Sequence, residues 1–137
     1  FDNGMEYFNS FGGNPVSSVV GDTVLKIIAE EGLQENAKDV GKYLKRQLLE
    51  LKYKNPIIGD IRGEGLFLGV EIVDLKKDKI PLPILASNII DKMRDKCILL
   101  SVDGPKKNII KIKPPLPFNK ENADFLVENF YKVLLSL

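Results

Sequence analysis

The spacing of the apolar residues changes at Asn55-Pro56, and this change constrains the fold more than any other feature of the chain. Before that point, apolar residues recur three or four positions apart in two segments, which is typical of helices with one buried face. The two stripes comprise Val16, Val19, Val20, Val24, Ile27 and Ile28, then Leu33, Ala37, Val40, Leu44, Leu48 and Leu51. Asn14 is a good N-cap for the first helix, and Gly32 is expected to end it. Asn55-Pro56 is expected to stop the second helix.

Beyond Pro56, apolar residues alternate with other residues, which predicts strands with one buried face. Residues 57–62 and 66–73 are expected to form an antiparallel hairpin around a turn at 63–65. A third helix near 85–93, short strands at 98–100 and 109–113, and a last helix capped by Asn119 complete the order. This order predicts an α+β fold, in which a small, mostly antiparallel sheet is covered by helices on one face.

Composition excludes several kinds of function. The 137 residues fit one domain, and 20 basic against 19 acidic residues give no reason to expect a nucleic-acid partner. No apolar run reaches the ~18 residues of a membrane helix, so no membrane partner is expected. The chain has no histidine and one cysteine, Cys97, which excludes a Ser-His-Asp triad, a His-ligated zinc site and an internal disulfide. No metal site is expected, and Cys97 is expected in the core.

Three short motifs occur in a fixed order along the chain. Residues 10–15 read Ser-Phe-Gly-Gly-Asn-Pro, residues 60–66 read Asp-Ile-Arg-Gly-Glu-Gly-Leu, and residues 110–116 read Ile-Lys-Ile-Lys-Pro-Pro-Leu. Each resembles a motif of the class III aminotransferases, which depend on pyridoxal 5′-phosphate (PLP), and together they span nearly the whole chain. The chain therefore resembles the C-terminal part of such an enzyme, whose small domain belongs to PLP fold type I.

The resemblance also implies a domain organisation. Residues 1–15 would be a loop from a large domain missing here, residues 16–32 a connecting helix, and residues 33–137 the C-terminal small domain. The lysine that binds PLP covalently would lie in the missing large domain, so no catalytic residue is assigned to this chain. The implied partners are that large domain, the second subunit of a homodimer and a small-molecule amine. Because the chain starts with Phe inside a loop, it is interpreted as a fragment. The expected location is cytoplasmic or mitochondrial, and no targeting segment is visible in the fragment.

A closer resemblance is to the subgroup of alanine–glyoxylate aminotransferase 2-like and ethanolamine-phosphate phospho-lyase proteins. It rests on residues 99–105, Leu-Leu-Ser-Val-Asp-Gly-Pro, on Asn108 and on residues 111–115, Lys-Ile-Lys-Pro-Pro. The implied activity is either transfer of an amino group to a keto acid or elimination of phosphate from a phosphorylated amine such as phosphoethanolamine. The alternative is a stand-alone α+β binding or dimerisation module without catalysis.

Ser10 is the candidate cofactor-binding residue. Its hydroxyl can donate to a phosphate oxygen, Gly12 and Gly13 allow a close backbone approach, and a helix that begins at Pro15 adds a favourable dipole. In the resembling family, a threonine at this position binds the PLP phosphate of the neighbouring subunit. The simpler interpretation is that these residues form only a turn and a helix cap.

Lys111 is the candidate substrate-binding residue. In α-amino-acid aminotransferases of the resembling family, an arginine here grips the substrate carboxylate with two bonds, a geometry that lysine cannot reproduce. A lysine suits a phosphate, and this favours elimination over amino transfer. The alternative is that Lys111 lies on the wet face of an edge strand. Arg62, at a strand end, is expected to hold the hairpin against a carboxylate of the large domain, and the alternative is that it contacts the substrate.

Overall fold

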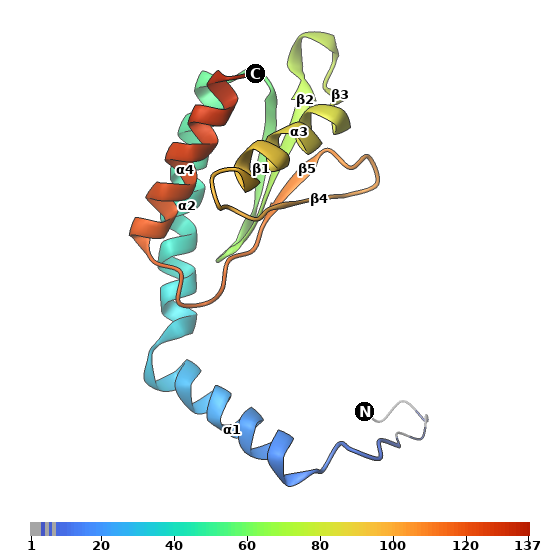
Figure 1. Cartoon of the computed structure of the whole chain (residues 1–137), viewed down its shortest axis with the longest axis vertical. Coiled ribbons are helices and arrows are strands. Elements are labelled where there is room, and N and C mark those ends of the chain that lie inside the picture. Colours follow the sequence, from blue (N-terminus) through green and yellow to red (C-terminus); the bar gives the residue numbers. More distant parts are fainter. Residues whose placement is uncertain (1–3, 5, 7) are drawn as a thin grey trace. The chain divides into compact units, whose positions relative to one another are not determined.

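The computed structural model describes residues 4, 6 and 8–137, and the chain divides into two compact units, Phe1–Leu33 and Gln34–Leu137 (Figure 1). Part of the predicted loop over 1–15, namely residues 1–3, 5 and 7, lies outside the described residues. The assignment of 1–15 and 16–32 to a loop and a connecting helix, and of 33–137 to a small domain, stays a prediction.

The first unit contains helix α1, Pro15–Glu30. Asn14 is its N-cap, and the side-chain Oδ1 of Asn14 accepts a hydrogen bond from the Ser17 amide at 2.9 Å. Gly32 has a φ of +61°, which an L side chain rarely adopts, and it ends the helix as predicted. All of α1 is described and none of its residues is buried; Val16 at the start of its apolar stripe is 75% exposed.

The second unit is a five-stranded antiparallel sheet with three helices (Figure 1). Its elements, from the end of the first unit onward, are α2 Leu33–Lys54, β1 Ile58–Glu64, β2 Phe67–Asp74, the 3-10 turn Leu75–Lys77, β3 Ile80–Pro81, α3 Pro83–Arg94, β4 Ser101–Asp103, β5 Ile109–Ile112 and α4 Lys120–Leu135. The strand order is β1-β2-β5-β4, and the two-residue β3 pairs with the end of β2. The predicted hairpin is the β1–β2 pair.

The core lies between one face of this sheet and helices α2, α3 and α4 (Figure 1). On that face Leu68, Val70 and Ile72 of β2 lie beside Ile110 and Ile112 of β5, and all five are buried. The helices contribute buried side chains of their own, including Leu44, Leu48, Ile89, Met93 and Phe130. The α+β architecture with helices on one sheet face is confirmed.

The position of β4 differs from the prediction. A strand was expected at 98–100, whereas β4 begins at Ser101. Pro114 and Pro115 lack the amide that a ladder needs, so β5 ends at Ile112 and offers little for residues before Ser101 to pair with. The amide of Ile98 instead donates to the Met93 carbonyl at 3.0 Å, which makes this segment part of the turn after α3.

The expectation for Cys97 is wrong as well, because this residue is exposed rather than in the core. Its φ of +60° and the hydrogen bond from its amide to the Arg94 carbonyl place it in the same turn after α3.

A close approach of two backbones fixes the hairpin against α2. Gly41 lies in the middle of α2, and a methyl group there would overlap the carbonyl of Gly65 in the turn between β1 and β2. Lys45, one turn further along α2, donates from Nζ to the Gly63 carbonyl at 2.9 Å. The end of the hairpin near its turn is therefore held from two points on one helix.

Candidate functional site on the open sheet face

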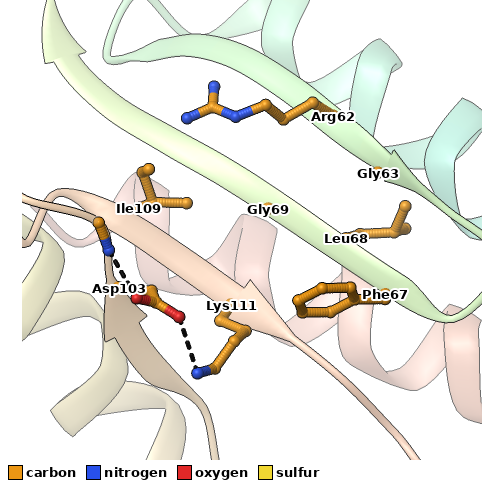
Figure 2. Close-up of a pocket in the computed structure, with 9 residues that line it drawn as sticks. Arg62, Gly63, Phe67, Leu68, Gly69, Asp103, Ile109 and Lys111 are labelled. Carbon is orange, nitrogen blue, oxygen red and sulfur yellow. Dashed lines mark hydrogen bonds and ion pairs between the residues drawn. The ribbon is translucent and has the colours of Figure 1, made fainter. Parts of the chain in front are cut away.

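The sheet face opposite the helices carries a hollow of about 370 Å³ (Figure 2). It is lined by Arg62, Gly63, Phe67, Leu68, Gly69, Asp103, Gly104, Ile109 and Lys111. These residues come from β1, β2, β4 and β5 or from the turn between β4 and β5. Because Ile110 and Ile112 point into the core, the alternation along β5 places Lys111 on the open face. β5 lies between β2 and β4, so Lys111 is not on an edge strand, as the alternative interpretation of the sequence had supposed.

Strand register explains why the hollow exists. Gly69 of β2 pairs with Arg62 of β1 on one side and with Lys111 of β5 on the other. Because glycine has no side chain, nothing on β2 fills the space between these two cations (Figure 2). A Cβ at position 69 would lie 3.1 Å from Cγ2 of Ile109, which is tighter than an ordinary contact. The absence of a side chain at Gly69 thus leaves the hollow open.

Lys111 forms an ion pair at the edge of this hollow. Its Nζ lies 2.8 Å from Oδ2 of Asp103, while the Gly104 amide donates to Oδ1 of the same carboxylate at 2.7 Å (Figure 2). The hydrogen bond from Lys111, followed by that from Gly104, lowers the pKa of Asp103 below its ordinary value. The Lys111 side chain is 34% exposed, so its ammonium group remains accessible from the solvent.

Arg62 is held within its own hairpin. Its Nη1 lies 3.0 Å from Oδ2 of Asp60 and 3.4 Å from Oε2 of Glu71. Partial burial acts to raise the pKa of Asp60, but hydrogen bonds from Arg62 and from the Ile61 amide outweigh it, so this pKa is lowered. The hydrogen bond to Asp60 is also the main reason why the pKa of Arg62 is raised. Arg62 thus pairs with carboxylates of its own hairpin, and a contact with a carboxylate of the large domain stays a prediction.

Ser10 lies in an exposed turn of the first unit, just before α1. The turn is closed by the Gly12 amide, which donates to the Asn9 carbonyl at 3.3 Å, and by the Asn14 amide, which donates to the Phe11 carbonyl at 3.1 Å. A Cβ on Gly13 would meet open space, so the backbone there is accessible. Ser10 and Lys111 belong to different compact units, and each is therefore considered by itself.

Asp103 is the one charged residue of the hollow that had no assigned role in the sequence. It appeared there only as part of a turn with Gly104 and Pro105. Its link to Lys111 depends on the register of β4 on β5, which pairs Asp103 with Ile109 and places Lys111 one diagonal step away on the same face. Among the described residues, no three His, Cys, Asp or Glu side chains are grouped to hold a metal ion. No described helix is both long and apolar enough to cross a membrane.

Comparison with known protein families identifies the family of the chain. The family model described as aminotransferase class-III matches residues 3–134. The chain therefore belongs to the class-III aminotransferase family.

Individual relatives lie in the subgroup that the sequence resembled. The chain is 43% identical over 135 residues to an alanine–glyoxylate aminotransferase 2-like protein of Drosophila melanogaster, covering 98% of this chain and 27% of that protein. It is 51% identical over 122 residues to alanine–glyoxylate aminotransferase 2 homolog 2, mitochondrial, of Arabidopsis thaliana, covering 89% of this chain and 26% of that protein. The chain thus spans about a quarter of the length of these curated relatives.

A solved structure is similar over almost the whole chain. It is a phospholyase from Arthrobacter in complex with phosphoethanolamine, which matches with a TM-score of 0.92 and 38% identity. The match covers 96% of this chain and 31% of the phospholyase chain. The predicted family and the α+β fold are confirmed by these findings.

Proposed function

We propose that this chain serves as the small-domain part of a PLP-dependent enzyme that acts on a small-molecule amine. Membership of the class-III aminotransferase family and the matching fold support the proposal. The partners would be a large domain of the kind that makes up the rest of the relatives, and a second subunit in a homodimer. The location stays either cytoplasmic or mitochondrial; the Arabidopsis relative is named as mitochondrial.

The chain's own residues fit one part of PLP, its phosphate group. Ser10 offers an exposed hydroxyl, Gly13 an accessible backbone, and α1 begins directly after them, which is a favourable combination for an anion. When bound, PLP supplies an electron sink for reactions at the carbon next to an amine. Ser10 would help to hold the phosphate of that cofactor.

The role of Ser10 is tested in the longer protein that contains this segment. Ser10→Ala is expected to raise the dissociation constant of PLP about ten- to hundredfold, because one hydrogen bond to a charged group is lost. The amount of PLP that remains after dialysis is the readout. Ser18→Ala, a change of an exposed serine inside α1, is the matched control. Equal PLP retention in both variants would mean that Ser10 only completes a turn.

Among the reactions open to this family, we favour elimination of phosphate from a phosphorylated amine such as phosphoethanolamine. The observation that carries this preference is Lys111, a lysine rather than an arginine, at the edge of the hollow on the open face. An ammonium group is a compact point charge that suits a phosphate, whereas a carboxylate is best gripped by the planar fork of arginine. The similarity to a phospholyase bound to phosphoethanolamine also supports it.

Amino transfer from an α-amino acid to a keto acid is the second candidate, favoured by the names of the Drosophila and Arabidopsis relatives. A stand-alone binding or dimerisation module, the other interpretation of the sequence, agrees less well with a family match over residues 3–134.

Lys111→Arg in the longer protein separates the two reactions. For a phospho-lyase, the variant is expected to release phosphate from phosphoethanolamine at a similar or lower rate and to use alanine no worse than before, since a bidentate carboxylate partner is restored. Lys132→Arg is the control, because Lys132 is also an exposed lysine paired with a carboxylate, Glu128. Efficient amino transfer from alanine by the unmodified protein, without phosphate release, would contradict the preference for elimination.

A further inference from the structure

The two cations that flank Gly69 differ in how firmly they are held. Arg62 is paired with two carboxylates, those of Asp60 and Glu71. Lys111 is paired with one, that of Asp103, through a single contact of 2.8 Å. An ammonium group has three donors, so two of the Lys111 donors are not used by Asp103. Lys111 is therefore the cation that can exchange its partner more easily.

The Asp103 carboxylate can lose its contact with Lys111 and still be held in position by another hydrogen bond. Its second oxygen, Oδ1, accepts from the Gly104 amide at 2.7 Å, and this bond does not involve Lys111. The Asp103 side chain is 56% exposed, so solvent can take over the oxygen that Lys111 leaves. Giving up an ion pair this exposed costs little free energy.

We propose that Asp103 is a built-in competitor for Lys111. It holds the ammonium group while the hollow is empty and yields it to the anionic group of a ligand, so it sets how weakly that group is retained. The proposal rests on the function proposed above, and it deepens it: an enzyme that eliminates phosphate must also release it. A carboxylate tethered beside the lysine competes with the bound phosphate and so favours its departure.

The direction of the effect follows from simple electrostatics. A phosphate near Lys111 either displaces Asp103, and loses the energy of that ion pair, or binds beside it and is repelled by a like charge. In both cases the carboxylate weakens phosphate binding. A residue that merely positioned Lys111 would have the opposite effect, because its removal would leave the lysine less well oriented and the phosphate bound more weakly.

The test is a titration of the 137-residue chain with inorganic phosphate, followed by the backbone amide signals of Lys111 and Gly104 in NMR spectra. In the unmodified chain both signals are expected to shift together, because the Gly104 amide reports on Asp103. In Asp103→Asn, which keeps an oxygen for the Gly104 amide, the Lys111 signal is expected to respond at about 1.5- to fivefold lower phosphate, the range that one exposed ion pair spans. Asp103→Ser, with a hydroxyl acceptor, is expected to behave in the same way.

Glu128→Gln is the matched control, since it removes the carboxylate of an exposed ion pair on α4 that does not line the hollow. It is expected to bind phosphate like the unmodified chain, and the core signal of Ile110 verifies that each variant is folded. Unchanged or weaker phosphate binding in the folded Asp103 variants would overturn the proposal. So would the absence of any phosphate response at Lys111. Neither result would decide the proposed reaction, which the release of phosphate from phosphoethanolamine tests separately.

Discussion

The two faces of the sheet are built from the same strands but differ in almost every physical property. On β5, the Ile110 side chain is 0% exposed and belongs to the hydrophobic core, whereas the side chain of its neighbour Lys111 is 34% exposed and pairs with Asp103. Apolar burial on the covered face supplies stability, and the open face is left with charges around a hollow. Alternation along a single strand therefore places a residue that stabilises the core directly beside a residue that can contact a ligand.

Adjacent substitutions on β5 give the largest expected contrast. Ile110→Ala is expected to lower the free energy of unfolding by about 2–5 kcal/mol, because it leaves a cavity in the core. Lys111→Ala is expected to change it by less than about 1 kcal/mol, since only an exposed ion pair is lost. Urea unfolding of the two variants, followed by circular dichroism, measures both values. Comparable losses would show that the open face also carries much of the stability.

The contact between α2 and the hairpin allows a second, smaller test. Gly41→Ala is expected to destabilise the fold by about 1–3 kcal/mol, because the added methyl group would overlap the Gly65 carbonyl and force the helix and the hairpin apart. Gly21→Ala is the control, as it lies within α1 with open space around it and is expected to be neutral or stabilising by up to about 1 kcal/mol. Thermal unfolding compares the two. A Gly41→Ala chain as stable as the control would mean that this backbone contact adjusts at little cost.

The smallest expected effect concerns the pKa of Asp103 on the open face. The pKa of Asp103 is lowered in the folded chain, so the pairing with Lys111 stabilises the fold above the ordinary carboxyl pKa, and this contribution is lost as the pH falls through the lowered value. In Lys111→Ala the pKa of Asp103 is expected to move back up toward its ordinary value. Titration of the carboxyl carbon by NMR measures it. Asp60, whose partners Arg62 and Lys52 are untouched, serves as the internal reference. An unchanged pKa of Asp103 would contradict the pairing.

Features that depend on local sequence were predicted well. The caps of α1 and α4, at Asn14 and Asn119, follow from side chains that satisfy the first amides of a helix. The burial of Leu68, Val70 and Ile72 follows from alternation, and so does the open-face position of Lys111. None of these requires knowledge of a distant partner.

Features that depend on a partner far along the chain were not predicted. The position of β4 is decided by where β5 ends. The exposure of Cys97 was missed for a local reason, because this residue lies at positive φ in the turn that follows α3. The pair of Lys111 with Asp103 requires the register of two strands, which the sequence does not state. The roles of Ser10 in cofactor binding and of Lys111 in substrate binding stay predictions, and the two residues lie in separate units.

The short edge strand β4 has a consequence for the behaviour of the protein in concentrated solution. One edge of the sheet is formed by only three residues, Ser101–Asp103, and the other by β1, which has an irregular register between Ile58 and Asp60 and carries charged side chains. Short, irregular and charged edges discourage a strand of another molecule from adding to the sheet. The sheet is thus protected against edge-to-edge aggregation, and fibrils that grow by strand addition are not expected to start from either side.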